Sequence, residues 1–122
     1  MYTSRLKTIN VDDRVTILSG NTESAVIDCI GASLVGINFP SVFEPTALFF
    51  KSAESENGTY GFVIDANGEL VTAHSTGANA RVRLGDILEL ERYIKIVANT
   101  AVPADRELTL IFKRYDKECP CS

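Results

Sequence analysis

Cysteine is the first residue type in this chain that could do chemistry, and its three copies fall into two settings. Cys29 lies in the apolar stretch 24–30, where a thiol is typical of a small core side chain. Cys119 and Cys121 flank Pro120 near the end of the sequence. One Cys-x-Cys pair supplies too few ligands for structural zinc, and its spacing disfavours a disulfide within the pair. Two interpretations remain open: exposed thiols in an unstructured tail, or intermolecular disulfides that tie the tail to a neighbouring subunit.

The other residues that could act as a catalytic or metal-binding group lack the partners that such chemistry needs. His74 is the single histidine, and no Gly-x-Ser-x-Gly elbow accompanies it, so we expect a solvated loop histidine. Asp65, Asn67 and Glu69 could offer oxygen ligands to Ca²⁺, but the same spacing is typical of a hairpin turn. The sequence therefore predicts that the protein is not an enzyme and has no catalytic residue, no metal site and no cofactor.

Partner-binding residues are expected at the ends of the chain and in its loops. Tyr2 and Tyr115 lie in the terminal segments, and tyrosine is a frequent interface residue, so both are candidate partner contacts. Loops are predicted at 52–59, 75–79 and 99–106, and these are the candidate positions for a carbohydrate site. The chain contains no tryptophan, which weakens the prediction of a sugar-stacking surface.

The elements that must position these residues are organised around the most apolar stretch, residues 33–52. Val35, Ile37 and Phe39 alternate with smaller residues, which predicts a strand with one buried face. Pro40 follows and should end this strand, because proline removes a backbone donor and fixes φ. The chain then resumes as a second apolar strand.

Alternating apolar residues separated by turn signals predict an antiparallel all-β protein. The expected strands are residues 14–18, 24–30, 33–39, 47–52, 60–65, 69–73, 80–84, 92–98 and 107–113. Residues 60–73 should form a hairpin, and residues 85–91 are the single predicted helical piece, with Asp86 as its cap. About nine short strands with a turn roughly every 8–12 residues favour a single-domain β-sandwich.

Length and charge restrict the domain organisation and the class of partner. A chain of 122 residues fits one domain, here a sandwich at 14–114 with an N-terminal arm at 1–13 and a C-terminal tail at 115–122. The net charge of −4, with no cluster of Lys and Arg, argues against nucleic-acid binding. No apolar run approaches the roughly 20 residues that span a bilayer, and residues 1–13 lack a signal-peptide core. We therefore expect no membrane partner and synthesis in the cytoplasm.

With the strands in this order, the chain resembles a group of small virion proteins of tailed bacteriophages. The likeness covers roughly residues 22–113. It is carried by Ala25-Val26-Ile27-Asp28, Leu34-Val35-Gly36-Ile37-Asn38-Phe39-Pro40, Ala47-Leu48-Phe49-Phe50, Ser52, Asn57-Gly58-Thr59-Tyr60, Asp65, Gly68, Arg92-Tyr93-Ile94-Lys95-Ile96 and Leu108-Thr109-Leu110. These residues form a pattern of strands and turns without a catalytic signature.

The resemblance implies both a fold and a function. The implied fold is a β-sandwich of the jelly-roll or discoidin-like kind. The implied function is that of a non-enzymatic structural protein of the virion, made in the host cytoplasm, that decorates or cements the head exterior. A neck, collar or tail component is the alternative, as is a module that binds carbohydrate or the host surface. The expected partners are major capsid or neck and tail proteins, together with further copies of the chain in a symmetric homo-oligomer.

Overall fold

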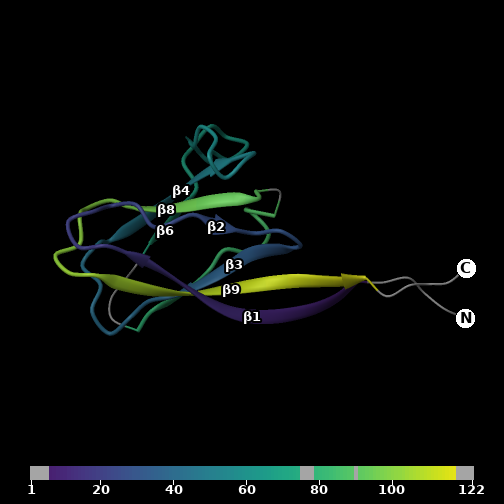
Figure 1. The fold of residues 1–122 in the computed structure, drawn as a ribbon, viewed down its shortest axis with the longest axis horizontal. Helices are drawn as coiled ribbons and strands as arrows, with labels where there is room; N and C mark the ends of the chain where they lie inside the picture. The colour runs from purple at the N-terminus through teal and green to yellow at the C-terminus, as the bar shows by residue number, and fades with distance from the viewer. Residues whose placement is uncertain (1–5, 75–78, 90, 118–122) are drawn as a thin grey trace, which may run out of the picture.

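The protein is described by a computed structural model over residues 6–74, 79–89 and 91–117, and every structural statement below concerns these residues. Nine strands form two antiparallel sheets (Figure 1). The strands are β1 (Leu6–Ile17), β2 (Ile27–Asp28), β3 (Ala32–Asn38), β4 (Ala47–Ala53), β5 (Gly61–Phe62), β6 (Thr72–His74), β7 (Arg81–Arg83), β8 (Tyr93–Ala98) and β9 (Arg106–Lys117). No helix occurs among these residues, so the prediction of an all-β sandwich is confirmed.

The order of the strands is that of a jelly roll. Sheet A has the order β1-β9-β3-β7, and sheet B has the order β2-β8-β4, with β5 and β6 pairing with the far side of β4. β4, β5 and β6 follow one another within sheet B, whereas all other consecutive strands lie in opposite sheets. The first and last strands, β1 and β9, are hydrogen-bonded neighbours. Two sheets connected in this way are the defining feature of jelly-roll sandwiches.

The core lies between the sheets and is built by alternate residues of each long strand. On β8, Ile94, Ile96 and Ala98 are buried, whereas the residues between them are half-buried. The other strands contribute Val15, Ile17, Leu34, Ile37, Leu48, Phe50, Leu108, Leu110 and Phe112. Each large apolar side chain buried in this way stabilises the fold by roughly 1.5–3 kcal/mol relative to an exposed one. On β8 and β9 the period of two in the sequence therefore identifies the buried face correctly.

A β-bulge in β3 changes which of its residues face the core. The pairing of β3 with β9 shifts register between Leu34 and Gly36. Leu34 is consequently fully buried, whereas Val35, which the simple alternation predicts to be a core residue, is half-buried on the outer face. The prediction for Val35 is wrong because a bulge inserts one residue into a strand and reverses the alternation around it.

The two terminal strands are longer than the sequence predicts. β1 begins at Leu6 rather than at residue 14, so residues 6–13 of the expected N-terminal arm form strand. β9 continues to Lys117 rather than ending at residue 113. The two strands pair without interruption from Leu6 opposite Lys117 to Ile17 opposite Arg106 (Figure 1). We call these two paired strands the β1–β9 ribbon. Its length could not be predicted from local sequence, because the backbone N–H and C=O groups of each strand are hydrogen-bonded to a strand that is distant in the sequence.

The predicted helix at 85–91 is wrong. The amide of Glu89 donates a hydrogen bond to the carbonyl oxygen of Asp86 at 3.0 Å, and the amide of Glu91 donates one to the carbonyl oxygen of Leu88 at 3.1 Å. Both bonds span three residues, so the segment forms successive turns instead of a helix. Leu88 is fully buried and ties these turns to the core. A segment this short forms too few helical hydrogen bonds to offset the cost of nucleating a helix.

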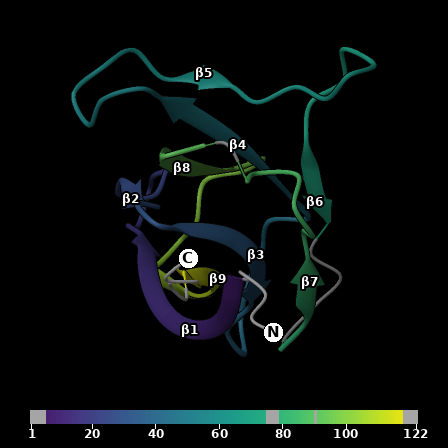
Figure 2. The same ribbon diagram turned by 90° about the vertical axis from the view of Figure 1, so that its right-hand side faces the viewer.

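Residues 54–70 connect β4 to β6 and pass over the outer side of sheet B, and we call them the 54–70 segment. Their strand β5 pairs with the end of β4, where Lys51 lies opposite Phe62. The predicted hairpin at 60–73 is reduced to one bridge between Ile64 and Leu70, because β5 and β6 both pair with β4 instead. Figures 1 and 2 show the segment on the side of sheet B that faces away from sheet A.

Candidate functional site

Cys29 is a core residue, as the sequence predicts. Its thiol is free and buried beside β2. Burial, assisted by the negative charge of Asp28, raises the pKa of the Cys29 thiol to about 12. Because the thiolate is the reactive form of cysteine, this residue is unsuited to nucleophilic chemistry at neutral pH.

Of the residues predicted to contact partners, Tyr115 alone belongs to the described part of the chain. Tyr2, Cys119 and Cys121 fall outside the described residues, so the intermolecular disulfide stays a prediction. Tyr115 belongs to β9, where its backbone lies opposite Thr8. The ribbon therefore brings residues from both ends of the sequence to one end of the sandwich.

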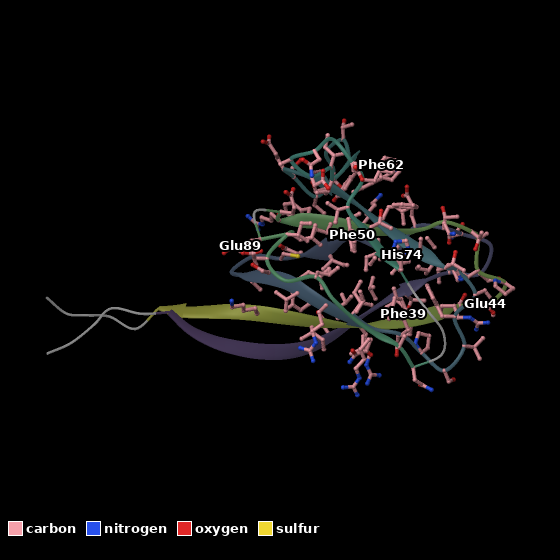
Figure 3. All side chains as sticks on the ribbon, turned by 180° about the vertical axis from the view of Figure 1, so that it is seen from behind. Phe39, Glu44, Phe50, Phe62, His74 and Glu89 are labelled. Atoms are coloured by element: carbon pink, nitrogen blue, oxygen red, sulfur yellow. The ribbon has the colours of Figure 1, made fainter. Side chains whose placement is uncertain are left out.

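The histidine and the predicted calcium ligands lie around one hairpin turn. His74, labelled in Figure 3, is exposed at the end of β6 rather than in a loop. It lines a hollow together with Asp65 and Glu69. Asp65 Oδ1 accepts hydrogen bonds from the amides of Asn67 at 2.8 Å and Glu69 at 3.0 Å. This carboxylate oxygen therefore closes the turn. Among the described residues, no group of three His, Cys, Asp or Glu side chains is arranged to hold a metal ion.

An ionic cluster on the outer face of sheet B was not found by sequence reasoning. Lys51 and Lys95 lie opposite each other on β4 and β8. Glu23 Oε2 accepts a hydrogen bond from Lys51 Nζ at 2.7 Å, and its Oε1 lies 3.8 Å from Lys95 Nζ. The hydrogen bond from Lys51 is the main reason why the pKa of Glu23 is lowered from 4.5. Strand alternation predicts that both lysines point outward, but nothing local identifies Glu23 as their partner.

Aromatic rings of the 54–70 segment cover this cluster. Lys51 Nζ lies 4.9 Å from the centroid of the Phe62 ring, and Lys95 Nζ lies 4.6 Å from that of Tyr60. Both are cation–π contacts. Figure 3 shows Phe62 outside sheet B, whereas Phe50 lies between the sheets. The cluster therefore fastens the 54–70 segment to the sheet, and we call it the lysine clamp.

A polar hollow of about 750 Å³ lies beside the lysine clamp. It is lined by Ser52, Ala53, Glu54, Ser55, Gly58, Thr59, Glu91 and Arg92. The Arg92 guanidinium stacks 4.8 Å from the centroid of the Tyr93 ring, and Nε lies 3.3 Å from Asp28 Oδ1. Hydroxyls, carboxylates and a guanidinium beside an aromatic ring offer the donors and acceptors that a polyhydroxyl ligand needs. This hollow coincides with the loop predicted at residues 52–59.

Two adjoining hollows on the outer face of sheet A form what we call the sheet A groove. The first, of about 430 Å³, is lined by Val35, Gly36, Asn38, Arg81, Val82, Arg83 and Ile111. The second, of about 380 Å³, shares Val35 and Arg83 and adds Ser33, Gly85, Asp86 and Lys113. Arg81 and Arg83 are exposed on one face of β7, as the alternation predicts. Among the described side chains, no carboxylate forms an ion pair with either arginine.

No family model, curated protein or solved structure matches this chain. Within the described ranges, no helix is long and apolar enough to cross a membrane.

Proposed function

We propose that the protein is a non-enzymatic structural subunit of a tailed-phage virion and that it decorates or cements the exterior of the head. The jelly roll supports the proposal, because viral capsid domains are prominent among proteins that use this sandwich. The resemblance of residues 22–113 to small virion proteins of tailed bacteriophages is the second reason for the proposal. The proposed partners are capsid proteins and further copies of this chain, with neck, collar or tail proteins as the alternative.

The observation that carries the proposal is the β1–β9 ribbon. Its two strands have 12 residues each and are the longest of the described chain. β1 is also an edge strand, and among the described residues its free side makes one bridge, between Ile17 and Ser24. A long unpaired edge is a template onto which another chain can add a strand. The ribbon is thus suited to joining a rigid sandwich to a neighbouring subunit, and Tyr2 and Tyr115 stay the predicted partner contacts.

The direct test is immunogold labelling of purified particles with an antibody raised against the recombinant domain. Even labelling over the head is the expected result. Labelling confined to the neck or tail would move the protein to the alternative position within the same class. Particles that carry no label, while the antibody binds the free protein, would contradict the virion proposal.

The terminal cysteines offer a second test on the same particles. If Cys119 and Cys121 link neighbouring subunits, unreduced samples should show a ladder of covalent oligomers on a denaturing gel. Reductant should collapse the ladder, and a variant with Cys119→Ser and Cys121→Ser should lack it. A monomer band in the unreduced wild-type particle would contradict the disulfide without affecting the labelling result.

Carbohydrate binding is the second candidate function, and the polar hollow beside the lysine clamp favours it. Jelly rolls also include lectin domains. A glycan screen should then show saturable binding that Arg92→Ala abolishes, because Arg92 lines the hollow and stacks on Tyr93. Arg14→Ala is the matched control, since Arg14 is an exposed arginine of β1 outside the hollow. Equal loss in both variants, or no saturable binding, would exclude this function.

A further inference from the structure

The charges of the molecule are divided between its two outer faces. The 54–70 segment contains four carboxylates, those of Glu54, Glu56, Asp65 and Glu69, and neither Lys nor Arg. It lies outside sheet B (Figure 2). The sheet A groove contains Arg81, Arg83 and Lys113 against one carboxylate, Asp86. One face is therefore acidic and the opposite face carries a basic groove.

The groove has the shape and chemistry to receive an acidic loop. Arg81 and Arg83 are two residues apart on one strand, so both guanidinium groups stand on the same side of the sheet. Guanidinium groups bind carboxylates through paired hydrogen bonds. Between the arginines and Ile111, the floor is formed by Gly36, where an added Cβ would lie 3.2 Å from the Val82 carbonyl oxygen. The glycine thus leaves the middle of the groove open.

The acidic turn at residues 54–58 is the part of the chain with complementary charge. A hydrogen bond of 3.0 Å from the Gly58 amide to the Ser55 carbonyl closes this turn. Glu54 and Glu56 are exposed, and among the described side chains neither forms an ion pair. The turn lies outside sheet B and cannot reach the groove of its own molecule across the sandwich (Figures 1 and 2).

We propose that the sheet A groove binds the 54–58 turn of a second copy of this chain. Arg81 and Arg83 then face the carboxylates of Glu54 and Glu56, while Val35 and Ile111 contact the turn itself. The contact joins two different surfaces, so it is heterologous and repeats from copy to copy as a ring or a linear stack. The proposal does not rest on a virion function, because it concerns the isolated chain.

Sedimentation velocity of the purified protein at low salt tests the proposal. The weight-average sedimentation coefficient of the wild type should rise with concentration, and added salt should reverse the rise, because salt screens exposed charges. Arg81→Glu with Arg83→Glu should weaken association by about a hundredfold or more, because like charges then face each other. Glu54→Lys with Glu56→Lys should do the same from the other side of the contact.

Mixing the two charge-reversed variants shows whether they fail to associate because of charge repulsion or because they do not fold. An equimolar mixture of the two charge-reversed variants should associate again, since each groove then meets an oppositely charged turn. One chain carrying all four substitutions should also associate. Glu69→Lys, at an exposed position outside both the groove and the 54–58 turn, is the control and should associate as the wild type does. A wild type that stays monomeric at every concentration, or a mixture that stays monomeric, would overturn the proposal.

Discussion

The outer faces of the two sheets hold their cations in opposite ways. On sheet B, Lys51 and Lys95 share the carboxylate of Glu23 and are covered by aromatic rings of the 54–70 segment. On sheet A, Arg81 and Arg83 are exposed, and no described carboxylate pairs with them. The first surface satisfies its charges within the molecule, whereas the second leaves them available to another molecule.

This difference has a physical basis in the neighbours of each pair. Lys51 and Lys95 lie directly opposite each other, so their like charges would destabilise the sheet without a compensating anion. Glu23 supplies that anion, and the side chains of the lysines are only 24% and 28% exposed. Arg81 and Arg83 stand on a short edge strand and need no such compensation. We therefore assign the lysine clamp to stability and the sheet A groove to binding.

The largest expected effect concerns the core that both faces share. Phe50→Ala should lower the free energy of unfolding by about 3–5 kcal/mol, because Phe50 is fully buried between the sheets. Phe49→Ala, at the next position of β4 and half-buried on the outer face, should cost about 1 kcal/mol. Chemical denaturation of both variants measures the difference. Equal losses would contradict the assignment of inner and outer faces in sheet B.

The next effect separates the lysine clamp from the sheet A groove. Glu23→Gln should lower the free energy of unfolding by about 1 kcal/mol, a figure that allows for partial solvent screening of a side chain that is 36% exposed. Arg83→Gln should change it by less than about 0.5 kcal/mol, because Arg83 has no described ion-pair partner. Denaturation curves of both variants measure these losses. A larger loss for Arg83→Gln than for Glu23→Gln would contradict the assignment of the lysine clamp to stability and of the sheet A groove to binding.

The contribution of the clamp should depend on pH. The pKa of Glu23 is lowered from 4.5 in the folded protein, chiefly by the hydrogen bond from Lys51. Its stabilising effect is therefore complete above the unfolded pKa and is lost as the pH falls through the lower, folded pKa. The stability difference between wild type and Glu23→Gln should shrink as the solution is acidified below pH 4.5. A difference that stayed constant would show that the Glu23 charge is not its source.

The smallest effect concerns the rings that cover the clamp. Tyr60→Ala removes the ring over Lys95 and should cost about 0.5–1 kcal/mol. The amides of β5 should then exchange hydrogen faster, because the 54–70 segment is less firmly held. Tyr60→Phe retains the ring and loses only the hydroxyl hydrogen bond to the Glu56 carbonyl, so it should stay close to wild type. Equal effects of the two substitutions would assign the restraint to the hydroxyl instead.

Much of the fold could be predicted because apolar and polar residues alternate along the strands. Each of the nine strands overlaps a predicted one, and the outward placement of Arg81 and Arg83 follows directly from Val82 between them. Cys29 is buried on the predicted apolar face. A period of two is a property of neighbouring residues, so a single sequence reveals it.

The remainder depends on contacts between residues far apart in the chain. The β1–β9 ribbon pairs residues 6–17 with residues 106–117, and the clamp brings Glu23 to Lys51 and Lys95. The bulge between Leu34 and Gly36 depends on the register with β9. The sheet A groove in turn depends on that bulge. Partners of this kind are set by tertiary packing, which one sequence does not display.

Hydrogen exchange of the wild type, compared between dilute protein at high salt and concentrated protein at low salt, tests the central claim most directly. If the sheet A groove is the binding surface and the clamp is internal, association should protect amides of β3, β7 and residues 54–58, while β8 remains unchanged. Protection confined to other parts of the chain, with β3 and β7 unaffected, would contradict the account.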